Sequence, residues 1–172
     1  MKKILPPVIS LTVIAGVCAA ILAGVNATTK GPIAEMRAKK ETEAVKAVMP
    51  AGVVEVAKED GGDFFVGRGA DGETLGFAAK GVDMKGYGGE IELMVGFEKD
   101  RKTVVCYRTL AAAETPGLGM KLKTKEFSGQ FEGRAASSLA VEKDGGEIKA
   151  ITSATITSRS VCRAIGDAAA KL

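Results

Sequence analysis

Residues 91–107 read IELMVGFEKDRKTVVCY, and this stretch decides the fold. Apolar and polar side chains alternate through Ile91–Phe97, which is the period of a strand with one buried face. A charged turn over residues 98–102 leads into a second β-rich run that begins at Thr103. The sequence therefore predicts a β-hairpin and, with it, an antiparallel sheet.

Glycine interrupts the chain before this hairpin. Eleven of the 22 glycines fall between Gly61 and Gly96, interleaved with short apolar runs, a pattern typical of strands joined by tight turns. After the hairpin, residues 127–139 fit either a short helix or a loop. The last apolar residues follow helical spacing and predict a closing helix that contains Val161, Ile165, Ala168, Ala169 and Leu172.

A helix is also predicted before the sheet, over Ile33–Val48. Pro32 fits its first helical position, and Glu35 and Lys39 form a stabilising i,i+4 pair. The segment is either a stalk or a helix that packs on the domain, because three apolar residues share one face: Ala44, Val45 and Val48. The predicted fold class is α+β, an antiparallel sheet with flanking helices.

One segment near the amino terminus is apolar enough to cross a membrane. Val8–Gly24 carries no charge and only Ser10 and Thr12 as polar side chains. A helix over residues 7–25 would be about 28 Å long, which matches the hydrocarbon thickness of a bilayer. The alternative is a cleaved signal peptide ending in a small-residue site at residues 25–27.

The charges that flank this segment do not fix its orientation, because cations lie on both sides. The short amino-terminal flank favours an amino terminus in the cytoplasm. The predicted organisation is a cytoplasmic segment over residues 1–6, a transmembrane helix in the cytoplasmic (inner) membrane over 7–25, a linker and stalk helix over 26–50, and an extracytoplasmic domain over 51–172.

Composition removes several classes of function. The 172-residue chain has no histidine, and its three cysteines lie far apart, so neither a metal site nor a catalytic triad is predicted. A net charge of +3, from 24 basic and 21 acidic side chains spread along the chain, gives no nucleic-acid footprint. Redox chemistry in this chain would need a bound organic cofactor.

A run of hydroxyls comes just before the closing helix. Residues 151–160 read ITSATITSRS, with six hydroxyl side chains in ten residues. The first N–H groups of a helix lack intrahelical acceptors and the helix dipole is positive there, so a phosphate is favoured at this place. Thr155 is the candidate for that contact, and Thr157 or Ser158 is the predicted N-cap.

Two glycine-rich segments are further candidates for a ligand site. Residues 114–121 read ETPGLGMK, in which Pro116 fixes φ while Gly117 and Gly119 permit positive φ and let the backbone approach a flat ligand. Residues 86–89 read GYGG and predict a turn before a strand. Each segment by itself is an ordinary turn signal.

Together and in this order, these features resemble the FMN-binding domain of the membrane-bound Rnf and sodium-translocating NADH:quinone oxidoreductase complexes. The resemblance covers the amino-terminal span, the Lys/Glu-rich helix and the GYGG, ETPGLG and TSATITS motifs. In that family the last Thr of a Ser/Thr-Gly-Ala-Thr motif carries FMN through a phosphoester, which by position implies covalent FMN on Thr155. A threonine hydroxyl is too weakly acidic to attack a phosphoryl group unaided, and the family uses a separate flavin transferase.

The resemblance also implies the other cofactor contacts. The flavin ring would lie against the loop 114–119, whose backbone groups would tune its potential, with Glu114 orienting the loop. The family commonly has Gly where Ser153 stands, so a positive φ would be strained there. The implied FMN-binding residues are Thr155, Glu114, Thr115, Gly117, Leu118, Gly119, Thr152, Ser153, Ala154 and Thr157.

The implied function is that of an electron-carrying flavoprotein subunit, without an active site of its own, among the other subunits of a membrane complex. The short chain favours the G subunit of an Rnf ion-translocating ferredoxin:NAD⁺ oxidoreductase over the C subunit of the quinone reductase. A third reading is a membrane-tethered FMN-binding module that passes no electrons. Ion translocation is assigned to partner subunits, because the predicted span carries no ionisable constellation.

Overall fold

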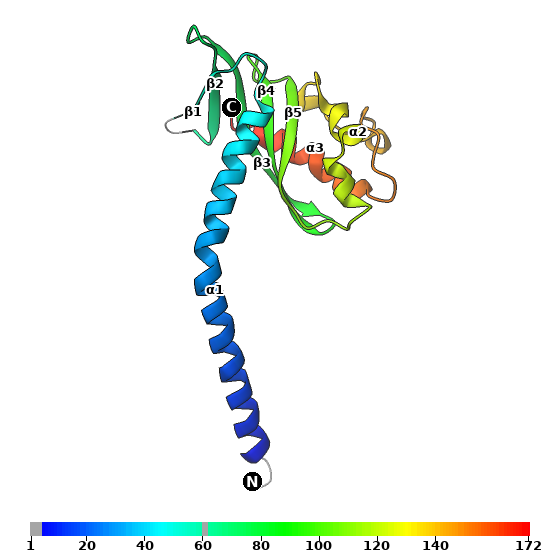
Figure 1. Ribbon diagram of the computed structural model, residues 1–172. Helices are drawn as coiled ribbons and strands as arrows, with labels where there is room; N and C mark the ends of the chain where they lie inside the picture. Colours follow the sequence, from blue (N-terminus) through cyan, green and yellow to red (C-terminus); the bar gives the residue numbers. More distant parts are fainter. Residues whose placement is uncertain (1–4, 60–61) are drawn as a thin grey trace. The chain divides into compact units, whose positions relative to one another are not determined.

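A five-stranded antiparallel sheet forms the centre of the fold (Figure 1). The computed structural model describes residues 5–59 and 62–172. The strands follow one another in chain order across the sheet: β1 Glu55–Lys58, β2 Phe64–Arg68, β3 Thr74–Gly86, β4 Gly89–Glu98 and β5 Val104–Ala112. The predicted α+β class with an antiparallel sheet is confirmed.

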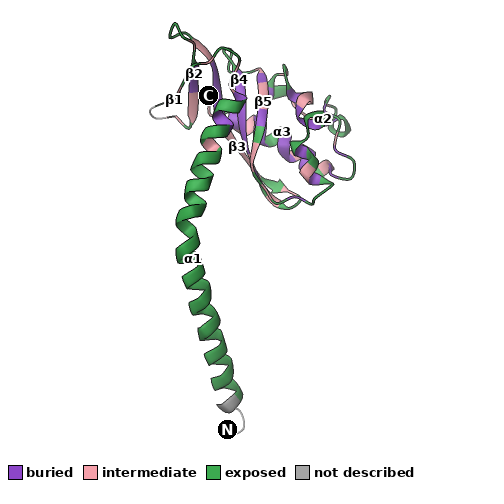
Figure 2. Ribbon diagram, viewed as in Figure 1, coloured by how far each residue is buried: buried purple, intermediate pink, exposed green. Residues whose placement is uncertain are grey.

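The predicted hairpin is formed by β4 and β5, with Val95 opposite Tyr107. The alternation in β4 has the expected effect, because Ile91, Leu93, Val95 and Phe97 are all fully buried in the larger core. Met94 belongs to a second, smaller core cluster. The sheet is therefore covered on both faces, and Figure 2 shows buried residues along β3, β4 and β5.

The closing helix α3, Thr155–Ala169, packs on the larger core. Its backbone comes so close to β3 that a Cβ at Gly81 would overlap the carbonyl oxygen of Ala164. Only glycine permits this approach. The predicted closing helix is confirmed, but it ends at Ala169, so the prediction that it contains Leu172 was wrong. The packing against β3 places its first turn beside the β3–β4 turn.

Short helical turns connect β5 to α3. The segment predicted as a short helix or a loop, residues 127–139, contains parts of both. The turns are η1 Gly119–Lys123, α2 Lys125–Ser128, η2 Gly129–Phe131, η3 Ala136–Ser138 and η4 Glu142–Asp144. Phe131 anchors them, since its ring lies edge-on to Tyr107 of β5 at 5.5 Å and to Phe127 of α2 at 5.4 Å.

The amino-terminal helix α1 runs over Leu5–Val48 without a break. Pro32 lies inside it, so the prediction that a new helix begins at Pro32 was wrong. The φ of proline suits a helix, and the cost is one lost backbone hydrogen bond and a steric contact within a helix of 44 residues. Residues 1–4 of the predicted cytoplasmic segment lie outside the described residues.

The chain divides into two compact units, Met1–Lys39 and Lys40–Leu172. The last turns of α1 belong to the second unit, where Ala44, Val45 and Val48 are buried in the smaller core cluster. That part of the predicted stalk therefore packs on the sheet. Within the described residues, α1 is the one helix long and apolar enough to cross a membrane, with a mean hydropathy of 2.5 over its most apolar window.

Candidate functional site

Three segments that are distant in the sequence meet around one pocket of about 510 Å³. They are the β3–β4 turn, the loop that follows β5, and the first turn of α3 together with the residues before it. The pocket is lined by Tyr87, Glu114, Thr115, Leu118, Gly119, Ser153, Ala154, Thr155, Ile156 and Thr157. Its volume lies within the range of about 300–1,000 Å³ typical of small-molecule sites.

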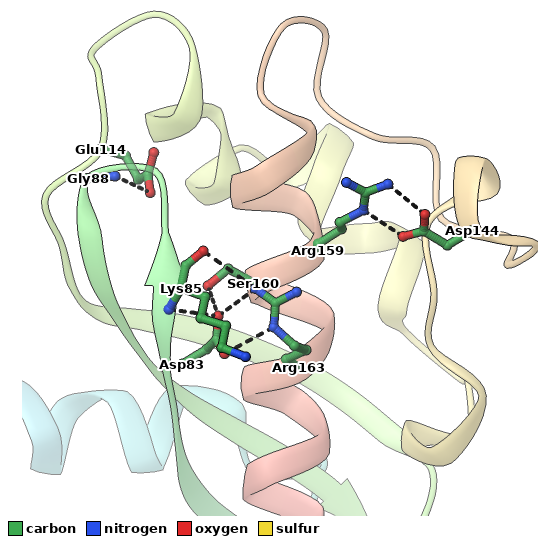
Figure 3. Close-up of polar contacts among 8 residues, drawn as sticks. All are labelled: Asp83, Lys85, Gly88, Glu114, Asp144, Arg159, Ser160 and Arg163. Carbon is green, nitrogen blue, oxygen red and sulfur yellow. Dashed lines mark hydrogen bonds and ion pairs between the residues drawn. The ribbon is translucent and has the colours of Figure 1, made fainter.

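The Glu114 carboxylate joins these three segments. Its side chain is only 6% exposed. The Gly88 N–H of the β3–β4 turn donates to Oε1 at 3.2 Å, as Figure 3 shows, and the Thr157 hydroxyl of α3 donates to Oε2 at 2.8 Å. Hydrogen bonds to a buried carboxylate are among the stronger ones in proteins, so Glu114 fixes the shape of the pocket from inside.

Gly119 has a packing role that the sequence did not reveal. A Cβ at this position would overlap the Glu114 carboxylate and lie 3.0 Å from the Thr157 hydroxyl. Gly117 has a φ of +77°, which glycine adopts without strain. The two glycines of the ETPGLG segment therefore differ, since Gly117 permits the turn and Gly119 makes room for the carboxylate.

Helix α3 begins at Thr155, and the residue before it, Ala154, makes no side-chain capping bond. The prediction that Thr157 or Ser158 caps this helix was wrong. Both hydroxyls lie inside the helix and point into the protein, where the Ser158 hydroxyl accepts from the Ile151 N–H at 2.9 Å and donates to the Ala154 carbonyl at 3.0 Å. The first turn of α3 therefore offers N–H groups to an anion instead of to a cap.

Ser153 adopts a φ of +60°, in the left-handed region that non-glycine residues rarely enter. The residue is exposed and belongs to the turn before α3. The strain expected where the family commonly has Gly is thus present in the backbone.

We expect the Ser153→Gly substitution to raise the free energy of unfolding by about 0.5–1 kcal/mol. The relief of the left-handed strain exceeds the entropy that glycine adds to the unfolded chain. Urea denaturation followed by circular dichroism measures the difference. A lower free energy of unfolding would contradict the strain argument.

The structure brings most of the predicted binding residues together. Eight of the ten line the pocket: Thr155, Glu114, Thr115, Leu118, Gly119, Ser153, Ala154 and Thr157. Gly117 does not line it, and Thr152 lines a neighbouring pocket of about 420 Å³ with Lys121 and Lys149. For all ten residues, contact with a cofactor stays a prediction.

Sequence reasoning missed two lining residues, Tyr87 and Ile156. Both are large and exposed, Tyr87 at 72% and Ile156 at 48%, and together with Leu118 they give the pocket an apolar rim. Tyr87 lies in the GYGG turn and Ile156 follows Thr155 directly, so both could have been found beside motifs already singled out.

Salt bridges hold α3 in place behind the pocket (Figure 3). Asp83 of β3 accepts from the Ser160 hydroxyl at 2.5 Å and from two nitrogens of Arg163 at 3.0 and 2.8 Å. Partial burial acts to raise the pKa of Asp83, but the bonds from Arg163 and Ser160 outweigh it and hold that pKa below its usual value. Arg159 forms a two-bond pair with Asp144 of η4, which lowers the pKa of that carboxyl.

We expect Asp83→Asn to lower the free energy of unfolding at pH 7 by about 1–2 kcal/mol, because the Asp83 side chain is only 12% exposed and loses its charged partner. The folded pKa is depressed, so this stability is present above the unfolded pKa of about 3.9 and is lost as the pH falls below it. Denaturation at pH 7 and pH 3 should show the gap between wild type and variant closing in acid. The exposed Asp71→Asn variant makes the same charge change, and its free energy of unfolding should stay close to that of wild type at both pH values.

Within residues 5–59 and 62–172, no group of three or more His, Cys, Asp or Glu side chains could hold a metal ion. The pocket instead combines a helix start, which favours a phosphate, with an apolar rim suited to a flat ring. Its chemical capacity is therefore to hold a ligand of that kind in a fixed position.

Comparisons with known proteins agree with this geometry. The profile of the FMN-binding domain family matches residues 86–170. A protein of Methanosarcina acetivorans, named as the G subunit of an ion-translocating oxidoreductase complex, is 30% identical over 97% of this chain and 93% of its own length. The chain belongs to this G-subunit family.

Another member of the G-subunit family and a solved structure extend the likeness. The G subunit of the Na⁺-translocating ferredoxin:NAD⁺ oxidoreductase complex of Acetobacterium woodii is 32% identical over 88% of this chain and 83% of its own length. The crystal structure of Shewanella oneidensis NqrC matches with a TM-score of 0.51 and 19% identity over 74% of this chain and 66% of that chain. This structural likeness shows a shared fold.

Proposed function

We propose that this chain is the electron-carrying G subunit of an Rnf ion-translocating ferredoxin:NAD⁺ oxidoreductase complex and that it works through FMN esterified to Thr155. The observation that carries the proposal is the position of Thr155, the first residue of α3, on the wall of a pocket large enough for a flavin ring. Family membership and the relatives' names give the class of complex.

The residues present fit FMN. A phosphate on Thr155 Oγ1 would lie at the uncapped start of α3, where free N–H groups and the helix dipole stabilise its negative charge. The apolar side chains of Leu118 and Ile156 would contact the ring, and the backbone of the loop 117–119 would face its polar edge. When bound, FMN accepts and releases one or two electrons, which no side chain of this pocket can do.

The chain's own residues supply position. Glu114 holds the pocket walls at a fixed separation, and Asp83 with Arg163 holds α3 against β3. The ester at Thr155 would keep the cofactor from diffusing away. Maturation is assigned to a separate flavin transferase, because Glu114, the one carboxylate among the described residues that line the pocket, accepts from Gly88 and Thr157 and not from Thr155.

For the membrane arrangement we propose residues 7–25 as the span, residues 1–6 in the cytoplasm and the domain over residues 51–172 on the extracytoplasmic side. The length and hydropathy of α1 support the span. The short amino-terminal flank supports the orientation. Other subunits of the complex are the proposed partners, and ion movement is assigned to them.

The test is to produce the full chain with and without a flavin transferase and to examine it under denaturing conditions. We expect a fluorescent band and an intact mass larger by one FMN less one water only when the transferase is present. A chain of bare mass after purification from its native membrane would overturn the proposal. The subunits that co-purify distinguish an Rnf complex from a quinone reductase and from a module that passes no electrons.

A further inference from the structure

A smaller pocket of about 210 Å³ lies beside the edge strand β5, away from the residues proposed to hold FMN. Its walls come from the end of α1, from β5, from η1 and from α2. The lining residues are Lys40, Tyr107, Arg108, Thr109, Leu122, Lys123 and Ser128, none of which lines the Thr155 pocket.

Three of these side chains are cationic, and no acidic residue lines the pocket. Lys40, Arg108 and Lys123 belong to three different elements, so the fold and not local sequence brings them together. In the part of the chain that the structure describes, none of the three forms an ion pair. Cations gathered around one small space repel one another, and an anion between them relieves that repulsion.

Hydroxyl groups complete the lining. The Thr109 Oγ1 atom is buried and has no hydrogen-bond partner, which is uncommon in folded proteins and calls for an explanation. Ser128, which is only 9% exposed, adds a second hydroxyl. Because the Thr109 Oγ1 atom has almost no accessible surface, a ligand oxygen in this pocket would accept from it after a change of the Thr109 χ1 rotamer.

The walls of the pocket are rigid. Tyr107 and Leu122 are 1% and 0% exposed, and the Tyr107 hydroxyl donates to the Leu122 carbonyl, which joins β5 to η1. The Lys40 ammonium donates to the carbonyl of Leu110 and is thereby held at the edge of β5. The cationic groups therefore project from a fixed frame.

We infer that this pocket binds a phosphate group. Guanidinium and ammonium donors together with hydroxyls match the several acceptor oxygens of a phosphate, and the space suits one such group and not a nucleotide. The phosphate can be free in solution or belong to a lipid headgroup. The site does not depend on FMN, because it shares no lining residue with the Thr155 pocket.

The test uses the full chain in uncharged detergent and measures binding of inorganic phosphate by calorimetry at constant ionic strength. We expect saturable binding with a Kd of about 1 mM. Arg108→Gln should weaken it by about tenfold or more. Arg68→Gln, which removes the same charge from an exposed position on β2, should leave it unchanged.

A second variant keeps the inference testable if Arg108→Gln folds poorly. Thr109→Val preserves shape and removes the unpartnered hydroxyl, so we expect a higher melting temperature without phosphate and a smaller rise when phosphate is added.

Vesicles of phosphatidylcholine with and without phosphatidic acid separate the two sources. Arg108-dependent binding of free phosphate identifies a soluble ligand, whereas Arg108-dependent binding only to the acidic vesicles identifies a headgroup. Absence of Arg108-dependent binding in both arms, or equal loss in Arg68→Gln, would overturn the inference.

Discussion

The Thr155→Val chain is expected to lose its flavin completely and to remain folded. Valine keeps the β-branched shape of threonine but has no oxygen that could form a phosphoester. No side-chain hydrogen bond of the fold depends on the Thr155 hydroxyl among the described residues, so the free energy of unfolding should change by less than about 0.5 kcal/mol. Electron transfer through the assembled complex should then stop, because the FMN on Thr155 is the redox group that we propose for this chain.

The measurement for Thr155→Val combines in-gel flavin fluorescence, intact mass and urea denaturation after production with a flavin transferase. Thr74→Val is the matched control, because Thr74 stands at the end of β3 opposite the pocket. That variant should carry one FMN per chain. If the Thr155→Val chain still carried FMN, the ester would have to be on another hydroxyl. If the variant did not fold, Thr155 would have a structural role.

The parts of the fold that were predicted correctly depend on local pattern. The alternation in residues 91–97 specifies β4, and the GYGG turn separates β3 from β4 because its glycines permit a tight reversal. The apolar spacing after Ser160 specifies α3. In each case residues a few positions apart contain the whole signal, so one sequence is sufficient.

The parts that were not predicted depend on contacts between distant residues. Glu114 binds Gly88 and Thr157, which are 26 and 43 positions away, and nothing in the sequence pairs them. The wrong N-cap has a different cause, a local one: the Ser158 hydroxyl accepts from the Ile151 N–H, seven positions earlier, and Ser158 lies inside α3. Family resemblance could name Glu114 as a site residue. Only the fold shows that its carboxylate links the β3–β4 turn to α3.

The two hydrogen bonds of the Glu114 carboxylate give a physical reason why the pocket has its shape. The proposed ester at Thr155 would fix one end of the cofactor, but the ring would stay in place only if the loop after β5 keeps its distance from α3. That distance is set by a buried carboxylate for which Gly119 makes room. The proposed site thus consists of one anchoring residue, Thr155, and a separate, buried support, Glu114.

Replacing Glu114 with alanine is expected to lower the free energy of unfolding by about 3 kcal/mol. The substitution leaves the buried Thr157 hydroxyl and the Gly88 N–H without their acceptor, and it opens a cavity beside Gly119. Flavin content after production with the transferase should fall as well, because the pocket walls are no longer held together. Urea denaturation and in-gel fluorescence measure the two effects.

Glu114→Gln is the informative partner of this variant, because a side-chain amide keeps an acceptor for Gly88 and can donate to Thr157. We expect it to recover most of the stability lost in Glu114→Ala, to within about 1 kcal/mol of wild type. Glu132→Ala, an exposed glutamate, controls for loss of a negative charge and should change little. If Glu114→Ala were as stable as Glu132→Ala, the carboxylate would not be the support, and the separation of loop and helix would need another cause.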